Sequence, residues 1–445
     1  MQHLPRQHPH PATRRRRTAT LATIACSVTF AATGLVAPAA EAAPVSAFYT
    51  PPADLPAEPG AIVKTQPMPV FAAPPGAGGA WPQTAQLVMY TSRTQDGSPV
   101  AVSGTYLEPT QPWQGPGARP TVVIAPGTTG QGDQCAASVA FSTGVALSAD
   151  PPSVSANQEA LSAAAWNSLG ARVLVTDYIG LGTPGIHTYV NRVEEAHAVL
   201  DAARAAENLS GTGPDTPLVL WGYSQGGGAT AAASELQPDY APELNLKGTW
   251  AGGPTADLTE VVRQIDGNLI GGAIGFAING FVERYPALRA TLEELTTPAG
   301  RATLDTIGTE CIGDIIFKQP FLRTNSFTID GRPLLDHLQA IPEAQQILAD
   351  QRIGTLRPQA PVLITSGRND DTVPYGQARQ LAEDWCAKDA TVTFRTNPLP
   401  PILPGTTIAN HFGPEIIDGF GTNNAVSYLV DRLDDKPISP GCTFD

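Results

Sequence analysis

The sequence predicts an α/β protein with a mostly parallel sheet and a helical segment inserted into it. Between residues 121 and 252, short uninterrupted apolar runs alternate with segments of helical periodicity. This alternation is typical of a parallel sheet whose strands are buried on both faces. From Gly253 to Arg357 the patterns are helical alone, and a strand pattern resumes at Pro361. We therefore expect a sheet-based core that is interrupted by helices.

The first 42 residues have the composition of an export signal. Arginines at positions 14–17 precede the apolar stretch Leu21 to Val36, and Ala40-Glu41-Ala42 offers a cleavage site before Ala43. Cleavage would remove five arginines and one glutamate, so the net charge would change from −14 to −18. Such a charge argues against nucleic acid and anionic membranes as partners. No later stretch is long and apolar enough to span a membrane, and we expect a secreted protein.

The mature chain divides into three expected parts: a core from 43 to 252, a helical cap from 253 to 357, and the rest of the core from 358 to 445. A segment rich in Pro, Ala and Gly, 44–82, is expected to be extended. Two antiparallel strands should follow at 86–93 and 100–107. We expect parallel strands at 121–125, 172–176, 247–251 and 361–366 and one that starts at Leu218, a further strand at 391–395, and core helices at 153–169, 191–207, 229–236, 375–386 and 424–433.

The cap is expected to be helical because its apolar residues recur every three to four positions. Its candidate helices are 258–265, 286–295, 301–306 and 342–350.

The most informative segment of the chain joins a buried strand to a helix. The apolar run from Leu218 leads into Gly222-Tyr223-Ser224-Gln225-Gly226, and a run of small residues follows. A Gly-x-Ser-x-Gly sequence in this context predicts a sharp turn that presents Ser224 at the end of the strand. A plain Gly/Ser turn is the alternative. We expect Ser224 to be an exposed nucleophile and the Gln225 N–H, at the helix N-terminus, to face a developing oxyanion.

A serine nucleophile needs an imidazole base and a carboxylate that orients it. Of the four histidines after residue 42, only His411 follows a strand that ends in a candidate acid, as the chain order of such a triad requires. His197 is interpreted as structural, while His187 lies in a loop and His337 lies in the cap. His411 as an ordinary surface-loop residue is the alternative.

The acid should follow the strand 361–366. The run Gly367-Arg368-Asn369-Asp370-Asp371-Thr372-Val373-Pro374 fits the acid loop of α/β-hydrolases, and in that register Asp370 is the triad acid. Asp371 would then be solvated or would cap the helix that starts near Pro374. Two alternatives stay open: Asp371 is the acid, or both carboxylates are helix caps.

The second oxyanion donor should come from the loop after strand 121–125. Thr128, which follows Pro126-Gly127, is our choice, and Thr129 is the alternative.

No cofactor or metal site is expected. No two histidines have the i, i+4 spacing of a helical zinc site, and Gly180-x-Gly182 lacks a dinucleotide-binding context. Four cysteines remain after residue 42, which suggests two disulfides in an exported chain, with three pairings open.

Taken together, these motifs resemble the secretory lipase family, typified by yeast lipase A and with many actinobacterial members. The resemblance rests on Pro126–Ala136, Thr176–Gly182, Gly222–Gly226 and Asn369–Tyr375, and on the helical insert between the serine and the acid. It implies an α/β-hydrolase fold with a cap and the hydrolysis of carboxylic esters such as acylglycerols. It also implies a Cys135–Cys311 bridge, which leaves Cys386–Cys442 as the second.

Within the cap, residues 269–281 are apolar on every face and too short to span a bilayer. A buried cap helix is one interpretation. The other is a mobile lid that lines an acyl pocket and makes transient contact with a lipid interface.

The sequence thus predicts a secreted serine lipase or esterase that acts on an ester or lipid substrate through an acyl-enzyme. The pentapeptide also resembles cutinases, so short-chain, polyester or cutin esterase activity is an alternative, as are an acyltransferase or peptidase with the same triad. A secreted binding protein on a hydrolase fold is the non-enzymatic alternative.

Overall fold

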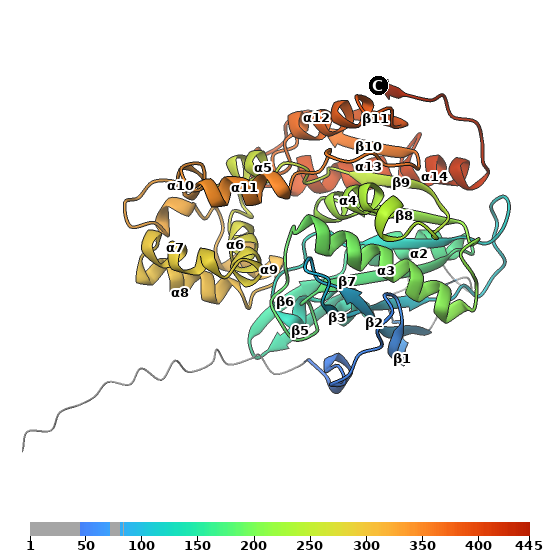
Figure 1. Cartoon of the computed structure of the whole chain (residues 1–445), viewed down its shortest axis with the longest axis horizontal. Coiled ribbons are helices and arrows are strands. Elements are labelled where there is room, and N and C mark those ends of the chain that lie inside the picture. Colours follow the sequence, from blue (N-terminus) through green and yellow to red (C-terminus); the bar gives the residue numbers. More distant parts are fainter. Residues whose placement is uncertain (1–44, 72–80, 83) are drawn as a thin grey trace, which may run out of the picture. The chain divides into compact units, whose positions relative to one another are not determined.

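A computed structural model describes residues 45–71, 81, 82 and 84–445 of the chain (Figure 1). The expected export signal, 1–42, and its cleavage site lie outside these residues. The described residues all belong to one compact unit.

Ten strands form one mixed sheet in the order β1-β2-β3-β7-β4-β8-β9-β10-β11-β12. The first three pair antiparallel, and β7 onwards are parallel to one another. In Figure 1, β1–β3 (blue) and β10–β11 (orange to red) lie towards opposite edges. The strands are β1 Ile62–Pro69, β2 Thr84–Arg93, β3 Pro99–Leu107, β4 Thr121–Ala125, β7 Arg172–Ile179, β8 Leu218–Tyr223, β9 Leu246–Gly252, β10 Val362–Gly367, β11 Val392–Asn397 and β12 Cys442–Phe444.

Helices cover both faces of the sheet and bury separate apolar clusters. On one face α3 (Arg192–Ser210), α4 (Gln225–Tyr240) and α12 (Tyr375–Cys386) pack against the strands. On the other face α1 (Ala137–Ala140), α2 (Glu159–Ser168) and α14 (Ala425–Leu433) do so. The central strands β4 and β8 are buried along their whole length, as continuous apolar runs predict for a parallel sheet.

Between β9 and β10 the chain is helical, and these helices bury apolar clusters of their own. Figure 1 shows α6 to α8 grouped together beside the sheet. Four of the seven helices agree with the segments that the sequence predicts, within a few residues. The seven are α5 Leu258–Ile265, α6 Ala273–Arg284, α7 Ala287–Leu295, α8 Pro298–Ile307, α9 Ile312–Lys318, α10 Leu334–Leu338 and α11 Pro342–Asp350.

The four cysteines form Cys135–Cys311 and Cys386–Cys442, the pairing that the resemblance implies. The first joins the core to the start of α9. The second joins the end of α12 to the edge strand β12.

One expected element differs. The single helix expected over 153–169 is instead strand β6 (Pro152–Ala156) followed by α2, and β6 pairs with β5 (Val145–Ala149) in a separate hairpin. Ser153 and Ser155 are buried while Val154 between them is exposed, which is the period of a strand. The remaining elements of the C-terminal part are the π-helix η4 (Ile408–Phe412) and α13 (Gly413–Phe420); three short 3-10 turns are η1 Ala47–Tyr49, η2 Asp133–Cys135 and η3 Thr324–Ser326.

Candidate active site

Strand β8 meets helix α4 at Ser224, in a turn that requires small neighbours. Ser224 has φ 59° and ψ −120°, a conformation that L-residues rarely adopt. A Cβ on Gly222 would lie 2.1 Å from the Gly226 carbonyl oxygen, and one on Gly226 would lie 2.0 Å from the Ala125 carbonyl oxygen. The two glycines therefore allow the close approach of strand and helix that the Gly-x-Ser-x-Gly pattern predicts.

The structure brings Ser224, His411 and Asp370 into one hydrogen-bonded chain. His411 Nε2 lies 2.8 Å from Ser224 Oγ, and His411 Nδ1 lies 2.8 Å from Asp370 Oδ2. A carboxylate only accepts, so Nδ1 carries the proton and Nε2 is free to accept from the serine hydroxyl. Ser224 is 8% exposed and His411 is 1% exposed. The expected exposure of Ser224 is thus wrong, because the ring of His411 lies against its hydroxyl.

Asp370 is held in place by its own loop. Its Oδ1 accepts the backbone N–H groups of Thr372 and Val373, at 2.8 and 2.9 Å, which leaves Oδ2 for His411. Fixing one oxygen by two backbone donors orients the carboxylate toward the imidazole.

Asp371 differs from its expected role, because it is neither solvated nor a cap of α12. It is buried, and its Oδ2 accepts the backbone N–H groups of Gly405 and Thr407 from the loop that precedes His411. The two adjacent carboxylates thus contact different partners, and the contact with the imidazole belongs to Asp370.

One candidate oxyanion donor, Thr128, lies in the loop after β4, and the other, Gln225, is the first residue of α4. Among the described residues, the backbone N–H groups of Thr128 and Gln225 have no hydrogen-bond acceptor, so both are free to bind an anion. The Thr128 hydroxyl is 2.8 Å from the Tyr189 hydroxyl. The carbonyl of the alternative residue, Thr129, accepts the N–H of Ile312. The choice between the two threonines remains a prediction.

Sequence reasoning missed the group that holds the Gln225 side chain. The side-chain Nε2 of Gln225 donates to Glu195 Oε1 at 2.8 Å and to His187 Nε2 at 3.0 Å. His187 Nδ1 faces the Ile179 carbonyl oxygen at 3.0 Å, so Nδ1 is the protonated nitrogen and Nε2 accepts. Burial lowers the pKa of His187 to about 4 and raises the pKa of Glu195 to about 8, so both are neutral near pH 7.

The other two histidines have structural surroundings. His197 stacks on the Tyr240 ring at 3.9 Å and contacts the Arg93 carbonyl, which fits the structural interpretation. His337, in α10, pairs with Asp330 at 3.0 Å.

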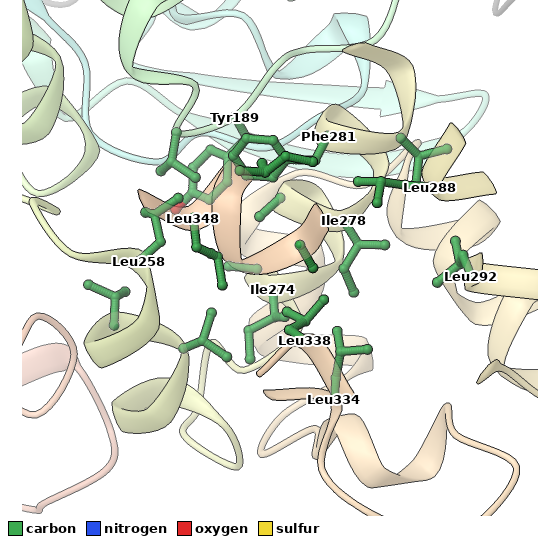
Figure 2. Close-up of a pocket in the computed structure, with 18 of the residues that line it drawn as sticks. Tyr189, Leu258, Ile274, Ile278, Phe281, Leu288, Leu292, Leu334, Leu338 and Leu348 are labelled. Carbon is green, nitrogen blue, oxygen red and sulfur yellow. The ribbon is translucent and has the colours of Figure 1, made fainter. Parts of the chain in front are cut away.

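An apolar cavity of about 130 Å³ lies among the helices between β9 and β10. Figure 2 shows leucine and isoleucine side chains from several of these helices around one space. Two residues of the lining contact elements that carry the site. The Tyr189 hydroxyl contacts Thr128. Thr255 packs against Gly228 of α4, where an added Cβ would lie 2.3 Å from Thr255 Oγ1. Segment 269–281 contributes Ala273, Ile274, Ala277, Ile278 and Phe281 to the lining.

The part of the chain that the structure describes contains no group of three or more His, Cys, Asp or Glu side chains that could hold a metal ion. It also contains no helix with the length and apolar character needed to cross a bilayer.

Comparison with known proteins places this site in a family context. Residues 147–441 match the family described as secretory lipase. A secreted triacylglycerol lipase of Malassezia furfur is 29% identical over 257 residues, which are 56% of this chain and 50% of that protein. A probable inactive lipase of Mycobacterium tuberculosis is 32% identical over 203 residues, 45% of either chain. The chain thus spans about half the length of these two relatives.

Among solved structures, Candida antarctica lipase A aligns with a TM-score of 0.71 and 21% identity, over 89% of this chain and 88% of that one. At this identity the likeness concerns the fold, which is that of the α/β-hydrolases, as the sequence predicts.

Proposed function

The chain belongs to the secretory lipase family, and from that premise we propose that it is a secreted serine hydrolase that cleaves carboxylic esters such as acylglycerols. The observation that carries the proposal is the chain of contacts from Ser224 through His411 to Asp370, 2.8 Å at each step. A hydroxyl, an imidazole and a carboxylate in this order form the arrangement that activates a serine nucleophile.

In the proposed reaction, His411 Nε2 takes the proton of Ser224 as Oγ attacks the ester carbonyl carbon. The N–H groups of Thr128 and Gln225 stabilise the oxyanion of the tetrahedral intermediate. The C–O bond to the alcohol then breaks, and His411 returns the proton to the departing alcohol. Water, deprotonated by His411, attacks the acyl carbonyl carbon, the bond to Ser224 Oγ breaks, and His411 returns the proton to Oγ as the acid is released. Every step uses groups of the chain itself, so the proposal requires no metal or organic cofactor.

The proposed substrates carry an apolar acyl chain, since the cavity beside the site is lined by aliphatic and aromatic side chains such as Ile274, Ile278 and Leu334. An acyl group attached to Ser224 would find this cavity beyond Tyr189, whose hydroxyl contacts Thr128. Burial of each methylene contributes roughly 0.8 kcal/mol, so the cavity favours longer acyl chains over acetate.

We further propose that residues 253–357 act as a cap on a core made of 43–252 and 358–445, with 269–281 as the part that lines the acyl site. Residues 1–42 would direct export. Transient contact of the cap with a lipid interface is part of the proposal, because Phe317, Phe321 and Ile329 of this segment are exposed.

Hydrolysis of p-nitrophenyl esters from acetyl to palmitoyl, measured for the parent and for Ser224→Ala, tests the proposal. We expect activity that extends to long chains in the parent and is lost in the variant. Activity that is confined to short-chain esters would indicate an esterase instead of a lipase. Equal rates in parent and variant would exclude the serine mechanism. A well-folded but inactive parent would favour the binding-protein alternative, and the name of the mycobacterial relative gives that outcome a precedent.

A further inference from the structure

The loop that carries His411 begins with a strained residue. Thr407 has φ 65° and ψ −34°, is fully buried, and directly precedes η4. A β-branched residue at positive φ is an outlier, and such strain persists only where surrounding contacts hold the backbone. The strained backbone of Thr407 therefore requires contacts that hold it in place.

One support comes from Asp371. Its Oδ2 accepts the N–H of Gly405 at 2.7 Å and the N–H of Thr407 at 3.1 Å. The Thr407 carbonyl in turn accepts the N–H groups of His411 at 3.0 Å and of Phe412 at 3.2 Å. A continuous chain of hydrogen bonds therefore leads from the Asp371 carboxylate to the backbone of His411.

The second support comes from the helical insertion, at Asn268 between α5 and α6. Asn268 Nδ2 donates to the Asp371 carbonyl at 2.6 Å, and the Thr407 hydroxyl donates to Asn268 Oδ1 at 2.8 Å. The next residue, Leu269, donates its N–H to the Gly405 carbonyl at 2.9 Å. Asn268, Asp371 and Thr407 are all buried, so water does not compete for these bonds.

We propose that Asn268, Asp371 and Thr407 form a clasp that positions His411 between Ser224 and Asp370, and that it makes the alignment of the triad depend on the insertion. This inference rests on the proposed function. Asp371 and Asn268 are positioning residues, because Asp371 contacts the backbone of the histidine loop, Asn268 contacts the Thr407 hydroxyl, and neither contacts the reacting atoms. The clasp gives Asp371 a role distinct from that of Asp370, although the two are neighbours in the sequence.

The test compares kcat and KM for p-nitrophenyl butyrate in Asp371→Ala, Asp371→Asn and Asp370→Asn. Removing the carboxylate in Asp371→Ala should lower kcat by about 10²-fold with little change in KM, because a displacement of about 1 Å costs that much. Asp371→Asn should retain most of the activity, since the amide oxygen still accepts both N–H groups. Asp370→Asn should lose about 10⁴-fold, because the imidazole would take the wrong tautomer.

Three further variants report on the clasp without changing a carboxylate. Asn268→Ala and the nearly isosteric Thr407→Val should each lower kcat, whereas Thr407→Ser should leave kcat near the parental value because it keeps the hydroxyl. Circular dichroism and the melting temperature of each variant separate a loss of alignment from a loss of folding. A purely structural role would lower the melting temperature and leave the kcat of the folded protein unchanged.

The outcomes are distinct for the two proposals. An inactive parent contradicts the proposed function. An active parent whose folded Asp371→Ala, Asn268→Ala and Thr407→Val variants keep the parental kcat overturns the clasp. A collapse of activity in Asp371→Asn but not in Asp370→Asn would also overturn it, because Asp371 would then be the triad acid.

Discussion

At the scale of single residues, close contacts of glycine decide whether Ser224 can occupy its turn. The Gly226 Cα faces the Ala125 carbonyl so closely that a methyl group would overlap it at 2.0 Å. Gly222 is crowded in the same way by Gly226 itself. The pattern of the pentapeptide is thus a packing requirement between β4, β8 and α4.

Gly226→Ala should therefore lower the free energy of unfolding by about 3 kcal/mol or more, in the range of severe core overpacking, and should abolish ester hydrolysis. Gly376→Ala is the matched control, because nothing lies within 4 Å of its added methyl in α12. That variant should stabilise the protein by roughly 0.5–1 kcal/mol. Urea denaturation measures both, and a fully stable, active Gly226→Ala protein would refute the packing argument.

The sequence predicts Ser224 and Asp370 because each stands in a local motif, and it predicts His411 because no other histidine after residue 42 follows the candidate acid. It does not predict the roles of Asp371, His187 or Glu195. The partners of Asp371 are Gly405 and Thr407, 34 and 36 residues away, and Glu195 meets Gln225 across 30 residues. No local sequence pattern indicates such pairs, because they form only when separate segments of the chain pack together.

At the scale of elements, the helices between β9 and β10 provide most of the lining of the apolar cavity, to which Tyr189, a partner of Thr128, also contributes. Helical periodicity predicts α5 and α11 with the bounds that the structure has. It does not predict the β5–β6 hairpin. The exposure of the small residues in these strands alternates at a period of two, but the same residues are also compatible with the start of a helix. Small apolar and hydroxyl residues are compatible with both structures, so tertiary contacts decide.

Ile278, from α6, is half-buried and lines the cavity. Ile278→Trp should fill it and lower kcat/KM for palmitoyl esters by at least about tenfold, while acetyl ester hydrolysis changes little. Arg289→Trp places the same side chain on the exposed side of α7 and serves as control. Equal effects of Ile278→Trp on long and short esters would mean that the cavity does not hold the acyl chain.

At the scale of the whole molecule, buried carboxyl groups link stability to pH. Burial raises the pKa of Glu195 to about 8 and the pKa of Glu159 to about 7, from an ordinary 4.5. Between these values the folded chain holds a proton that the unfolded chain has lost, so stability falls as pH rises. His187 acts oppositely between pH 4 and 6.5, because burial lowers its pKa to about 4.

The free energy of unfolding should therefore fall between pH 6.5 and 8, where the carboxyl groups with raised pKa values contribute and His187 no longer opposes them. Each contributes up to about 1.4 kcal/mol per pH unit. Glu195→Gln keeps an acceptor for Gln225 and Val190 and removes one titrating group, so its slope should be shallower. Urea denaturation at pH 6.5, 7.2 and 8.0 measures the slopes, with the exposed Glu294→Gln as control. Parallel slopes for parent and Glu195→Gln would contradict this account.

The parallel part of the sheet could also be predicted at this scale, because its strands are continuous apolar runs. The two edge strands of the sheet could not be predicted from the sequence. Strand β1 lies in a segment expected only to be extended, and β12 has three residues near the C-terminus. Short edge strands carry little pattern of their own, since pairing with a neighbour defines them.

The central claim, that Ser224 is the nucleophile of an ester hydrolase, is tested most directly by a p-nitrophenyl alkylphosphonate. Its phosphorus forms a bond to the attacking serine Oγ and releases p-nitrophenolate. We predict one adduct per chain, located on the Ser224 peptide by mass spectrometry, with ester hydrolysis lost in proportion to labelling. Continued ester hydrolysis without an adduct on Ser224 would contradict the claim.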